Sequence, residues 1–314
     1  MDPTEFMDDL IAEFVVPTFI ESVPETFKDW ASLLFYHTRR TREAKGILVN
    51  SFTELETHAF YSLSDGKTPP VYPVGPILNL SSARTDKFAD IIKWLNDQPR
   101  SSVVFLGFGS MGRFREEQLK ETVTALEQSS VTFLWSLRQS APKDKNTVKY
   151  VSPRDYSYLR HVLPAEFLDR TAERGKVIGW TPQVDVLAHP KIGGFVSHCG
   201  WNSTLESIGF GVPMATWPLH AEQHLNAFEL VKELGLAVEI KLDYKSEFYG
   251  EDNDDTVVSA KEIESGIRRL MEPDNEMRKK VKELSEKSKA TILKGGSTDS
   301  FMSCFINYMI DNHP

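Results

Sequence analysis

The residues best suited to bind a diphosphate form the hexapeptide His198-Cys199-Gly200-Trp201-Asn202-Ser203, between an expected strand and an expected helix. Free backbone N–H groups and the helix dipole attract an anion to the start of such a helix. His198 can donate a hydrogen bond to the same anion, and Asn202 and Ser203 can add side-chain donors. Ligands of open α/β sheets bind at the carboxyl ends of parallel strands. The hexapeptide therefore predicts a diphosphate cradle.

Side chains suited to the rest of a nucleotide sugar lie on both sides of this hexapeptide. Glu206 comes one helical turn after Asn202, where its carboxylate can accept hydrogen bonds from two ribose hydroxyls. Trp180 follows another expected strand and offers a flat surface for a base. Glu222 and Gln223 carry acceptors and donors that suit sugar hydroxyls. The whole segment therefore predicts a site for a nucleoside diphosphate sugar.

A second loop that could meet phosphate is Gly107-Phe108-Gly109-Ser110-Met111-Gly112, directly after an expected strand. Its glycines are spaced as in the dinucleotide fingerprint, which lets phosphate approach the backbone. That fingerprint also requires an acidic residue about 20 residues later, at the end of the second strand. Here that strand ends in Trp135-Ser136-Leu137-Arg138. We therefore favour a phosphate loop of another kind over NAD(P) binding, and a glycine turn without a ligand is the remaining alternative.

Strands that alternate with helices must position these residues. Apolar runs predict strands at 102–108, 131–137, 176–179, 194–197, 213–217 and 236–240. Helical patterns cover 115–128, 202–209, 223–234, 259–271, 275–294 and 297–311. This alternation indicates a doubly wound parallel sheet. Earlier in the chain, 46–50 is a strand candidate, and Thr53 and Glu56 have the spacing of a capping box that would open a helix up to Leu63.

Composition limits the classes of protein that fit. A chain of 314 residues, 40% hydrophobic and 26% charged, is globular with about two domains. Its 36 basic and 45 acidic residues argue against a nucleic-acid partner. No apolar run is long enough for a membrane span, and the first residues do not read as a signal peptide. Since there is no such run, we expect no membrane partner. Two cysteines make no disulfide framework, so we expect a reducing compartment and therefore a cytoplasmic protein.

The segment from Trp180 to Gln223 closely resembles the signature box of plant secondary-product UDP-glycosyltransferases, in register and without a gap. The resemblance continues through 71–76 and 105–112 to the C-terminal helix, so it covers essentially the whole chain. It implies an α/β fold of GT-B type. This chain would hold one complete doubly wound, Rossmann-like C-terminal domain and a remnant of the N-terminal Rossmann-like domain.

The resemblance also implies where the domains lie. Residues 1–68 would be the remnant of the acceptor-binding domain, and 88–296 the domain that binds the UDP-sugar. Between them, four prolines disfavour helix, and we interpret 69–87 as the interdomain linker. In the family, the segment that corresponds to 297–314 is a helix that packs back towards the N-terminal domain.

The family's binding roles carry over to the matching positions. Trp180 would stack on uracil, the main chain near Thr181 and Gln183 would read its edge, and Glu206 would hold the ribose. The residues expected at the diphosphate are Ser110, His198, Asn202 and Ser203, and those expected at the sugar are Trp201, Glu222 and Gln223. Gln223 ends the box and is associated with glucose donors. Glu222 stands where many members have Asp.

The implied reaction is an inverting, metal-independent transfer from a UDP-sugar, expected to be UDP-glucose, to a hydroxyl of a small plant metabolite such as a phenolic. No cofactor is expected, since the UDP-sugar is a co-substrate. The family's general base is an N-terminal His oriented by an Asp. We find neither in this sequence, and His37 and His58 are poor replacements. The alternatives are a non-catalytic UDP-sugar-binding fragment or a naturally short relative.

Overall fold

The computed structural model describes residues 39–78, 88–109, 112, 114–137, 163–179, 181–219, 222–242 and 257–311. The chain divides into two compact units. Among the described residues, the smaller unit contains those up to Val49 together with Thr57–Tyr72, and the larger contains Asn50–Glu56 and those from Pro73 onward. The expected domain boundaries stay predictions, and residues 79–87 of the expected linker lie outside the described ranges.

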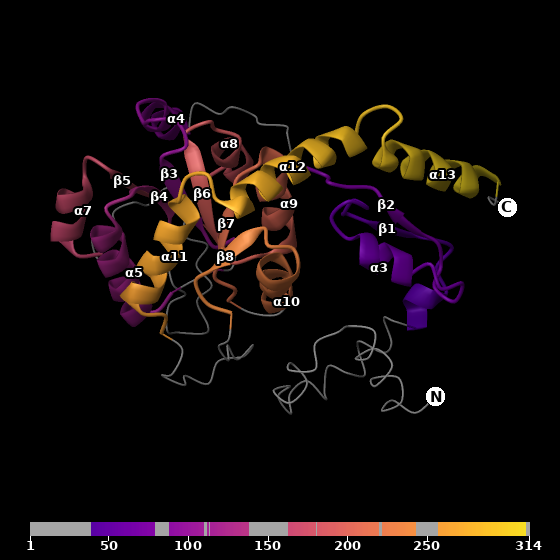
Figure 1. Cartoon of the computed structure of the whole chain (residues 1–314), viewed down its shortest axis with the longest axis horizontal. Helices are drawn as coiled ribbons and strands as arrows, with labels where there is room; N and C mark the ends of the chain where they lie inside the picture. Colours follow the sequence, from indigo (N-terminus) through magenta and orange to yellow (C-terminus); the bar gives the residue numbers. More distant parts are fainter. Residues whose placement is uncertain are drawn as a thin grey trace, which may run out of the picture. The chain divides into compact units, whose positions relative to one another are not determined.

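The larger unit is built on a six-stranded sheet whose neighbouring strands are all parallel (Figure 1). The strands are β3 (Val103–Gly107), β4 (Thr132–Ser136), β5 (Gly175–Ile178), β6 (Ile192–Ser197), β7 (Met214–Thr216) and β8 (Ala237–Glu239). Their order across the sheet is β5-β4-β3-β6-β7-β8. Counted within this unit, that is the order 3-2-1-4-5-6 of the Rossmann fold. The predicted doubly wound sheet is confirmed.

Several helices of this unit contact one another in two groups. The elements are α4 (Ala89–Asn96), α5 (Glu116–Ser129), α7 (Ala165–Thr171), α8 (Gln183–Leu187), α9 (Trp201–Phe210), α10 (Gln223–Phe228), the π-helix η4 (Glu229–Glu233), α11 (Ala260–Met271), α12 (Glu276–Thr291) and α13 (Ser297–Asp311). In one group α5 packs on α11, which contacts β6, β7 and β8. In the other, α9 contacts α8 and α12, and α8 contacts β3 and β6.

The core lies around the two central strands, and every residue of β3 and β6 is buried. Such strands read as continuous apolar runs because both faces of a parallel sheet are covered. Phe105 and Phe195 stack across the pair with their ring centroids 5.1 Å apart. Phe195 and Trp217 are both buried in this core.

Helix ends follow local capping signals at some positions and not at others. α11 begins with a capping box, in which Ser259 and Glu262 are bonded reciprocally. The helix expected up to Leu63 is present as α3 (Thr57–Ser62), but its expected start at Thr53–Glu56 is wrong, because the helix begins only after this stretch. Burial of Phe52 and Leu55 in the core of the larger unit holds the stretch in a turn, in which the N–H of Leu55 bonds to the carbonyl of Phe52.

In the smaller unit, β1 (Ile47–Val49) pairs with β2 (Val71–Pro73) in a two-stranded sheet. The N–H of Ile47 donates to the carbonyl of Pro70 at 2.9 Å. The apolar side chain of Leu48 is half exposed. The strand expected at 46–50 is therefore confirmed, and one of its apolar side chains faces solvent in the unit as described.

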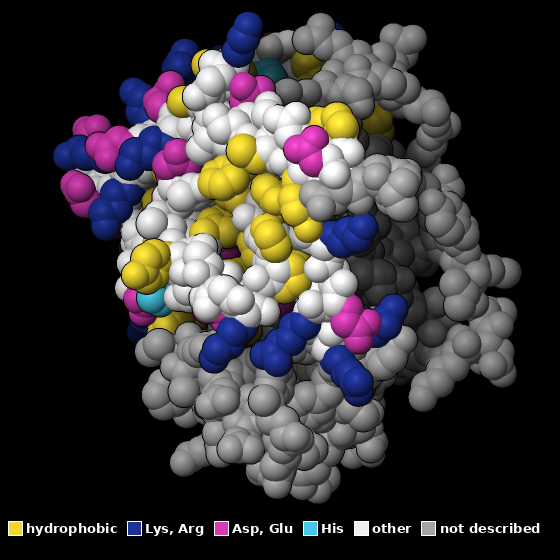
Figure 2. All heavy atoms as spheres, turned by 90° about the vertical axis from the view of Figure 1, so that its right-hand side faces the viewer, with side chains coloured by type: hydrophobic (Ala, Val, Ile, Leu, Met, Phe, Trp, Pro, Cys, Tyr) yellow, Lys and Arg dark blue, Asp and Glu magenta, His cyan; other side chains and the backbone are white. Residues whose placement is uncertain are grey.

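Helix α13 is fixed at its start and carries exposed apolar side chains further on. Thr298 is buried and donates through Oγ1 to the carbonyl of Gly75 at 2.5 Å. Ile306, Met309 and Ile310 are exposed. Figure 2 looks at the side of the molecule on which Figure 1 draws this helix, and it shows hydrophobic side chains gathered on that face. The expected packing of this helix towards an N-terminal domain stays a prediction.

Replacing Glu229 by Gln should stabilise the protein at neutral pH. Burial, with the nearby carboxylates of Glu56 and Glu233, raises the pKa of Glu229. A carboxyl whose pKa is higher in the folded chain than in the unfolded chain destabilises the fold when it is charged. The gain from Glu229→Gln should therefore be full above the raised pKa and fade as pH falls through it.

Urea unfolding of wild type and Glu229→Gln over a series of pH values measures this difference. The exposed Glu272, at the end of α11, provides the control: Glu272→Gln should leave the free energy of unfolding at neutral pH close to that of wild type. A stabilisation by Glu229→Gln that is as large in acid as at neutral pH would contradict the electrostatic explanation.

Candidate functional site

The candidate residues gather where three strands of the larger unit end. β4 and β5 lie on one side of β3, and β6, β7 and β8 lie on the other, so the strand order reverses between β3 and β6. Gly107 and Ser197, the last residues of these two strands, are in register. Such a switch point is the usual ligand crevice of a doubly wound sheet. The loops that follow β3, β5 and β6 carry the predicted phosphate, base and ribose residues.

The described residues at the two ends of the glycine loop after β3 are hydrogen-bonded to each other and rest on an aromatic cluster. The N–H of Gly112 donates to the carbonyl of Phe108 at 3.0 Å. Phe108 meets Phe114 and Trp217 edge to face, at centroid distances of 4.5 and 5.4 Å. Trp217 directly follows β7, so the cluster ties the glycine loop to the end of that strand.

The imidazole of His198 lies against both glycine-bearing turns of the switch point. A Cβ atom on Gly109 would lie 2.4 Å from Nε2 of His198, and one on Gly200 would lie 2.6 Å from the same atom. Gly109 also has φ +67°, a conformation that glycine adopts without cost. Only glycine at both positions therefore lets the ring lie here. The structure thus brings the loop after β3 to the residue that begins the predicted diphosphate cradle.

Helix α9 begins directly after His198 and supplies free backbone N–H groups. Gly200 is its N-cap, in an extended conformation, and its carbonyl accepts from the N–H of Thr204 at 3.0 Å. The preceding N–H groups of the first turn have no partner within a helix. Asn202 is exposed in this first turn and Ser203 is buried. The helix dipole and these donors make the turn attractive to an anion.

A side-chain cluster joins the loop after β5 to helix α9. The amide Nε2 of Gln183 donates to Oγ of Ser203 at 2.9 Å and to Oε2 of Glu206 at 2.7 Å. Burial raises the pKa of Glu206, and the hydrogen bond from Gln183 acts in the opposite direction. The amide thereby orients a half-buried carboxylate, which sequence reasoning assigned to the ribose. The side-chain role of Gln183 was missed, because no sequence pattern indicates that the starts of α8 and α9 meet.

The residues expected at the sugar and the base differ in their burial and in their hydrogen bonds. The indole Nε1 of Trp201 donates to the carbonyl of Asn50 at 2.8 Å, so this donor is already engaged. Gln223 is buried, and its Oε1 accepts from the N–H of Leu219 at 3.0 Å, whereas Glu222 is exposed. Thr181 is buried at the end of the β5 loop. Ser110 and Trp180 lie outside the described residues, so their expected roles stay predictions.

Cys199 sits in the centre of the cradle as a packing residue. It is fully buried, and burial raises the pKa of its thiol to about 12. A thiol with such a pKa is protonated at neutral pH and is a weak nucleophile. Its backbone has φ +62°, and its carbonyl accepts from Nδ2 of Asn226 at 2.9 Å.

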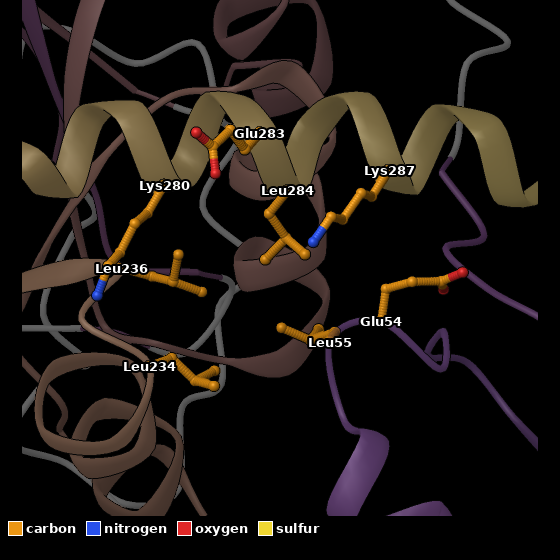
Figure 3. Close-up of a pocket in the computed structure, with 8 residues that line it drawn as sticks. All are labelled: Glu54, Leu55, Leu234, Leu236, Lys280, Glu283, Leu284 and Lys287. Carbon is orange, nitrogen blue, oxygen red and sulfur yellow. The ribbon is translucent and has the colours of Figure 1, made fainter.

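A small hollow of about 180 Å³ lies elsewhere in the larger unit. Leu55, Leu234, Leu236 and Leu284 give it apolar walls (Figure 3). Its charged lining residues are Glu54, Lys280, Glu283 and Lys287, the last three of which project from α12. None of the candidate residues lines it. The hollow is therefore separate from the candidate site.

Across the parts of the chain that the structure describes, no helix is both long and apolar enough to cross a membrane. Within the same residues, no group of three or more His, Cys, Asp or Glu side chains could hold a metal ion.

The order of the strands, the glycine-bearing turns at the switch point and the oriented carboxylate of Glu206 are features typical of nucleotide-binding α/β proteins. Comparison with known proteins specifies the family. The family model "UDP-glucoronosyl and UDP-glucosyl transferase" matches residues 78–249, more than half of the chain. The chain belongs to this family, and the resemblance found in the sequence is confirmed.

Individual relatives agree with this assignment. UDP-glycosyltransferase 71A15 of Malus domestica is 56% identical over 304 residues, and the match covers 94% of this chain. UDP-glucose flavonoid 3-O-glucosyltransferase 6 of Fragaria ananassa is 51% identical over 322 residues, which cover 98% of this chain. The crystal structure of a UGT transferase from Siraitia grosvenorii in complex with UDP matches with a TM-score of 0.80 and 50% identity over 90% of this chain. The GT-B fold expected from the resemblance is confirmed.

The chain spans just under two thirds of the length of these relatives. The match covers 62% of the Malus protein, 65% of the Fragaria protein and 64% of the Siraitia chain. The comparisons therefore establish the family and the fold, and the activity of the whole protein is a matter for proposal.

Proposed function

We propose that this chain provides the donor-binding part of a UDP-glycosyltransferase that transfers glucose from UDP-glucose to a hydroxyl of a small plant metabolite. The transfer proceeds with inversion, and neither a metal nor a cofactor takes part. The observation that carries the proposal is the contact of His198 with Gly109 and Gly200 at the switch point of the sheet. Together with the start of α9, this contact supports a phosphate site in the usual ligand crevice of the fold.

In the proposed reaction, the acceptor oxygen forms a bond to the anomeric carbon while the bond from that carbon to the diphosphate oxygen breaks. UDP leaves with the electron pair, and the acceptor proton passes to a general base. Negative charge develops on the leaving diphosphate, where the N–H groups and dipole of α9 and the imidazole of His198 stabilise it. The family resemblance assigns the general base and its Asp partner to the N-terminal part of the fold.

Two further observations support the details of the proposal. Gln223 matches the position associated with glucose donors, and the Fragaria relative is named for UDP-glucose and a flavonoid. Flavonoids and other phenolics are therefore the first acceptors to test. Cys199 and Cys304 are both free thiols in the structure, which suits the reducing cytoplasm in which we propose that the protein acts.

Replacing His198 by Ala should weaken UDP binding about tenfold or more, because a hydrogen bond to a charged group contributes about 1.5–3 kcal/mol. Uridine, which lacks the phosphates, should bind almost as well as to wild type. Calorimetric titration of both ligands into both proteins measures this. An equal loss for uridine would mean that the loop has collapsed, and the assignment of His198 to the phosphates would then be wrong.

A transfer assay with UDP-glucose and a panel of phenolics, with and without EDTA, tests the reaction itself when this chain is joined to the N-terminal part of a relative that supplies the general base. Transfer that EDTA leaves unchanged supports the proposed activity. UDP binding without transfer to any acceptor would favour the alternative of a non-catalytic UDP-sugar-binding fragment.

A further inference from the structure

Asn50 joins three segments of the larger unit that are far apart in the sequence. Its backbone carbonyl accepts from the indole Nε1 of Trp201 at 2.8 Å, across 151 residues. Its side-chain Oδ1 accepts from the N–H of Ile77, also at 2.8 Å. The neighbouring carbonyl of Ser51 accepts from the N–H of Gly75 at 2.7 Å. The backbone carbonyl and the side chain of Asn50 therefore both accept hydrogen bonds.

The segment Asn50–Glu56 is firmly seated where it makes these contacts. Phe52 is completely buried, and with Leu55 it belongs to the main core of the larger unit. A Cβ atom on Gly75 would lie 2.6 Å from Oδ1 of Asn50 and 2.7 Å from the nitrogen of Ser51, so the two backbones approach as closely as glycine allows. A carbonyl held on both sides in this way is a rigid acceptor for the indole.

At the other end of this bond, Trp201 is the first residue of α9, the helix whose start we assign to the diphosphate. Its ring is half-buried and packs on the main core. The N-cap residue of α9 is Gly200, which has no side chain to cap this end of the helix. The hydrogen bond from the indole to Asn50 thus holds the first turn of α9 from the side. This is the turn whose free N–H groups must point toward the proposed diphosphate.

We propose that Asn50 is a positioning residue of the diphosphate site, acting through Trp201; the inference rests on the proposed function. The carbonyl of Asn50 fixes the indole, and the indole fixes the first turn of α9 and the direction of its N–H groups. The side chain of Asn50 keeps its own carbonyl in place by its bond to Ile77. The indole nitrogen of Trp201 is thereby assigned to this anchor and not to the sugar.

The test compares two Trp→Phe variants that lose the same atoms. Trp201→Phe removes the donor to Asn50. Trp135→Phe is the matched control, because Trp135 is buried in β4 and its indole nitrogen has no hydrogen-bond partner among the described residues. Titration of the full chain with UDP and uridine should show a Kd for UDP raised about three- to tenfold by Trp201→Phe, the effect of one hydrogen bond. The Kd for uridine should change by less than about twofold, and Trp135→Phe should leave the ratio of the two Kd values as in wild type.

Substitutions of the side chain of Asn50 provide a second test. This test does not require the fold to tolerate a substitution at Trp201. Asn50→Ala removes the acceptor for Ile77 and should also raise the Kd for UDP more than that for uridine. Asn50→Asp keeps an oxygen at this position and should restore most of the affinity. The loss in the double variant Trp201→Phe, Asn50→Ala should be smaller than the sum of the single losses in free energy, since both act on one anchor.

The outcomes separate this inference from the proposed function. Failure of wild type to bind UDP would overturn both. Binding by wild type, with a ratio of UDP to uridine affinity that neither Trp201→Phe nor Asn50→Ala changes, would overturn only the positioning role. Equal weakening of UDP and uridine by these variants would also overturn it, because general loosening of the fold moves both ligands.

Discussion

Gly109→Ala should reduce UDP affinity about 10- to 100-fold while leaving the chain folded. The new Cβ atom would lie 2.4 Å from Nε2 and 2.8 Å from Cε1 of His198, so the imidazole must move away from the phosphate turn. Loss of a hydrogen bond to a charged ligand costs about 1.5–3 kcal/mol, and each 1.4 kcal/mol is about tenfold in affinity. The substitution also forces a side chain into the left-handed region, which costs about 1–2 kcal/mol of stability.

Gly66→Ala separates the two effects. Gly66 has φ +73°, close to that of Gly109, but a Cβ atom there meets nothing within 4 Å. Both variants should therefore lose similar stability in urea unfolding, and only Gly109→Ala should lose UDP affinity. If the two variants bound UDP equally well, His198 would have no part in holding the phosphates.

Glu206→Gln should weaken uridine and UDP alike, by about 10- to 100-fold, because charge-assisted hydrogen bonds to the ribose are lost. Wild type should also bind UDP better than 2′-deoxy-UDP, and in Glu206→Gln this preference should largely disappear. Glu283→Gln, at the separate hollow beside α12, is the matched control and should change neither affinity. A preference for UDP that survives in Glu206→Gln would remove Glu206 from the ribose site.

The same carboxylate predicts a pH dependence of binding. Burial raises the pKa of Glu206, and only the charged form is a strong acceptor for ribose hydroxyls. The affinity of wild type for uridine should therefore fall as pH falls through this raised pKa, earlier than for an ordinary carboxyl. Uridine is the right ligand, because it has no phosphate that titrates in this range. The profile for Glu206→Gln should be flat, and a sloping profile in that variant would assign the titration to another group.

Much of this molecule follows from local patterns. The strands β3 and β6 are continuous apolar runs because both faces of the sheet are buried, so their positions are visible in the sequence. The start of α11 is set by Ser259 and Glu262, which are three residues apart. The cradle after β6 is predictable for the same reason, since His198 and the first turn of α9 are adjacent along the chain.

The contacts that sequence reasoning missed are non-local. Gln183 reaches Glu206 across 23 residues, and Trp201 reaches Asn50 across 151, and no short pattern records either meeting. At Thr53–Glu56 a local helix signal is present, but burial of Phe52 and Leu55 outweighs it. Local signals thus place the elements, and tertiary contacts decide which side chains of the site are oriented and by what.

The larger unit is discontinuous along the chain, since Asn50–Glu56 belongs to it while the residues on both sides of that stretch belong to the smaller unit. This affects how such proteins can be recombined. A chimera of two relatives with one crossover in the proline-containing stretch 69–87 would combine helix α9 and most of the core from one parent with Asn50, Phe52 and Leu55 from the other. Clean exchange of donor specificity therefore requires two more crossovers, one on each side of residues 50–56, so that this stretch comes from the same parent as the rest of the larger unit. Libraries built without them will combine core residues from different parents.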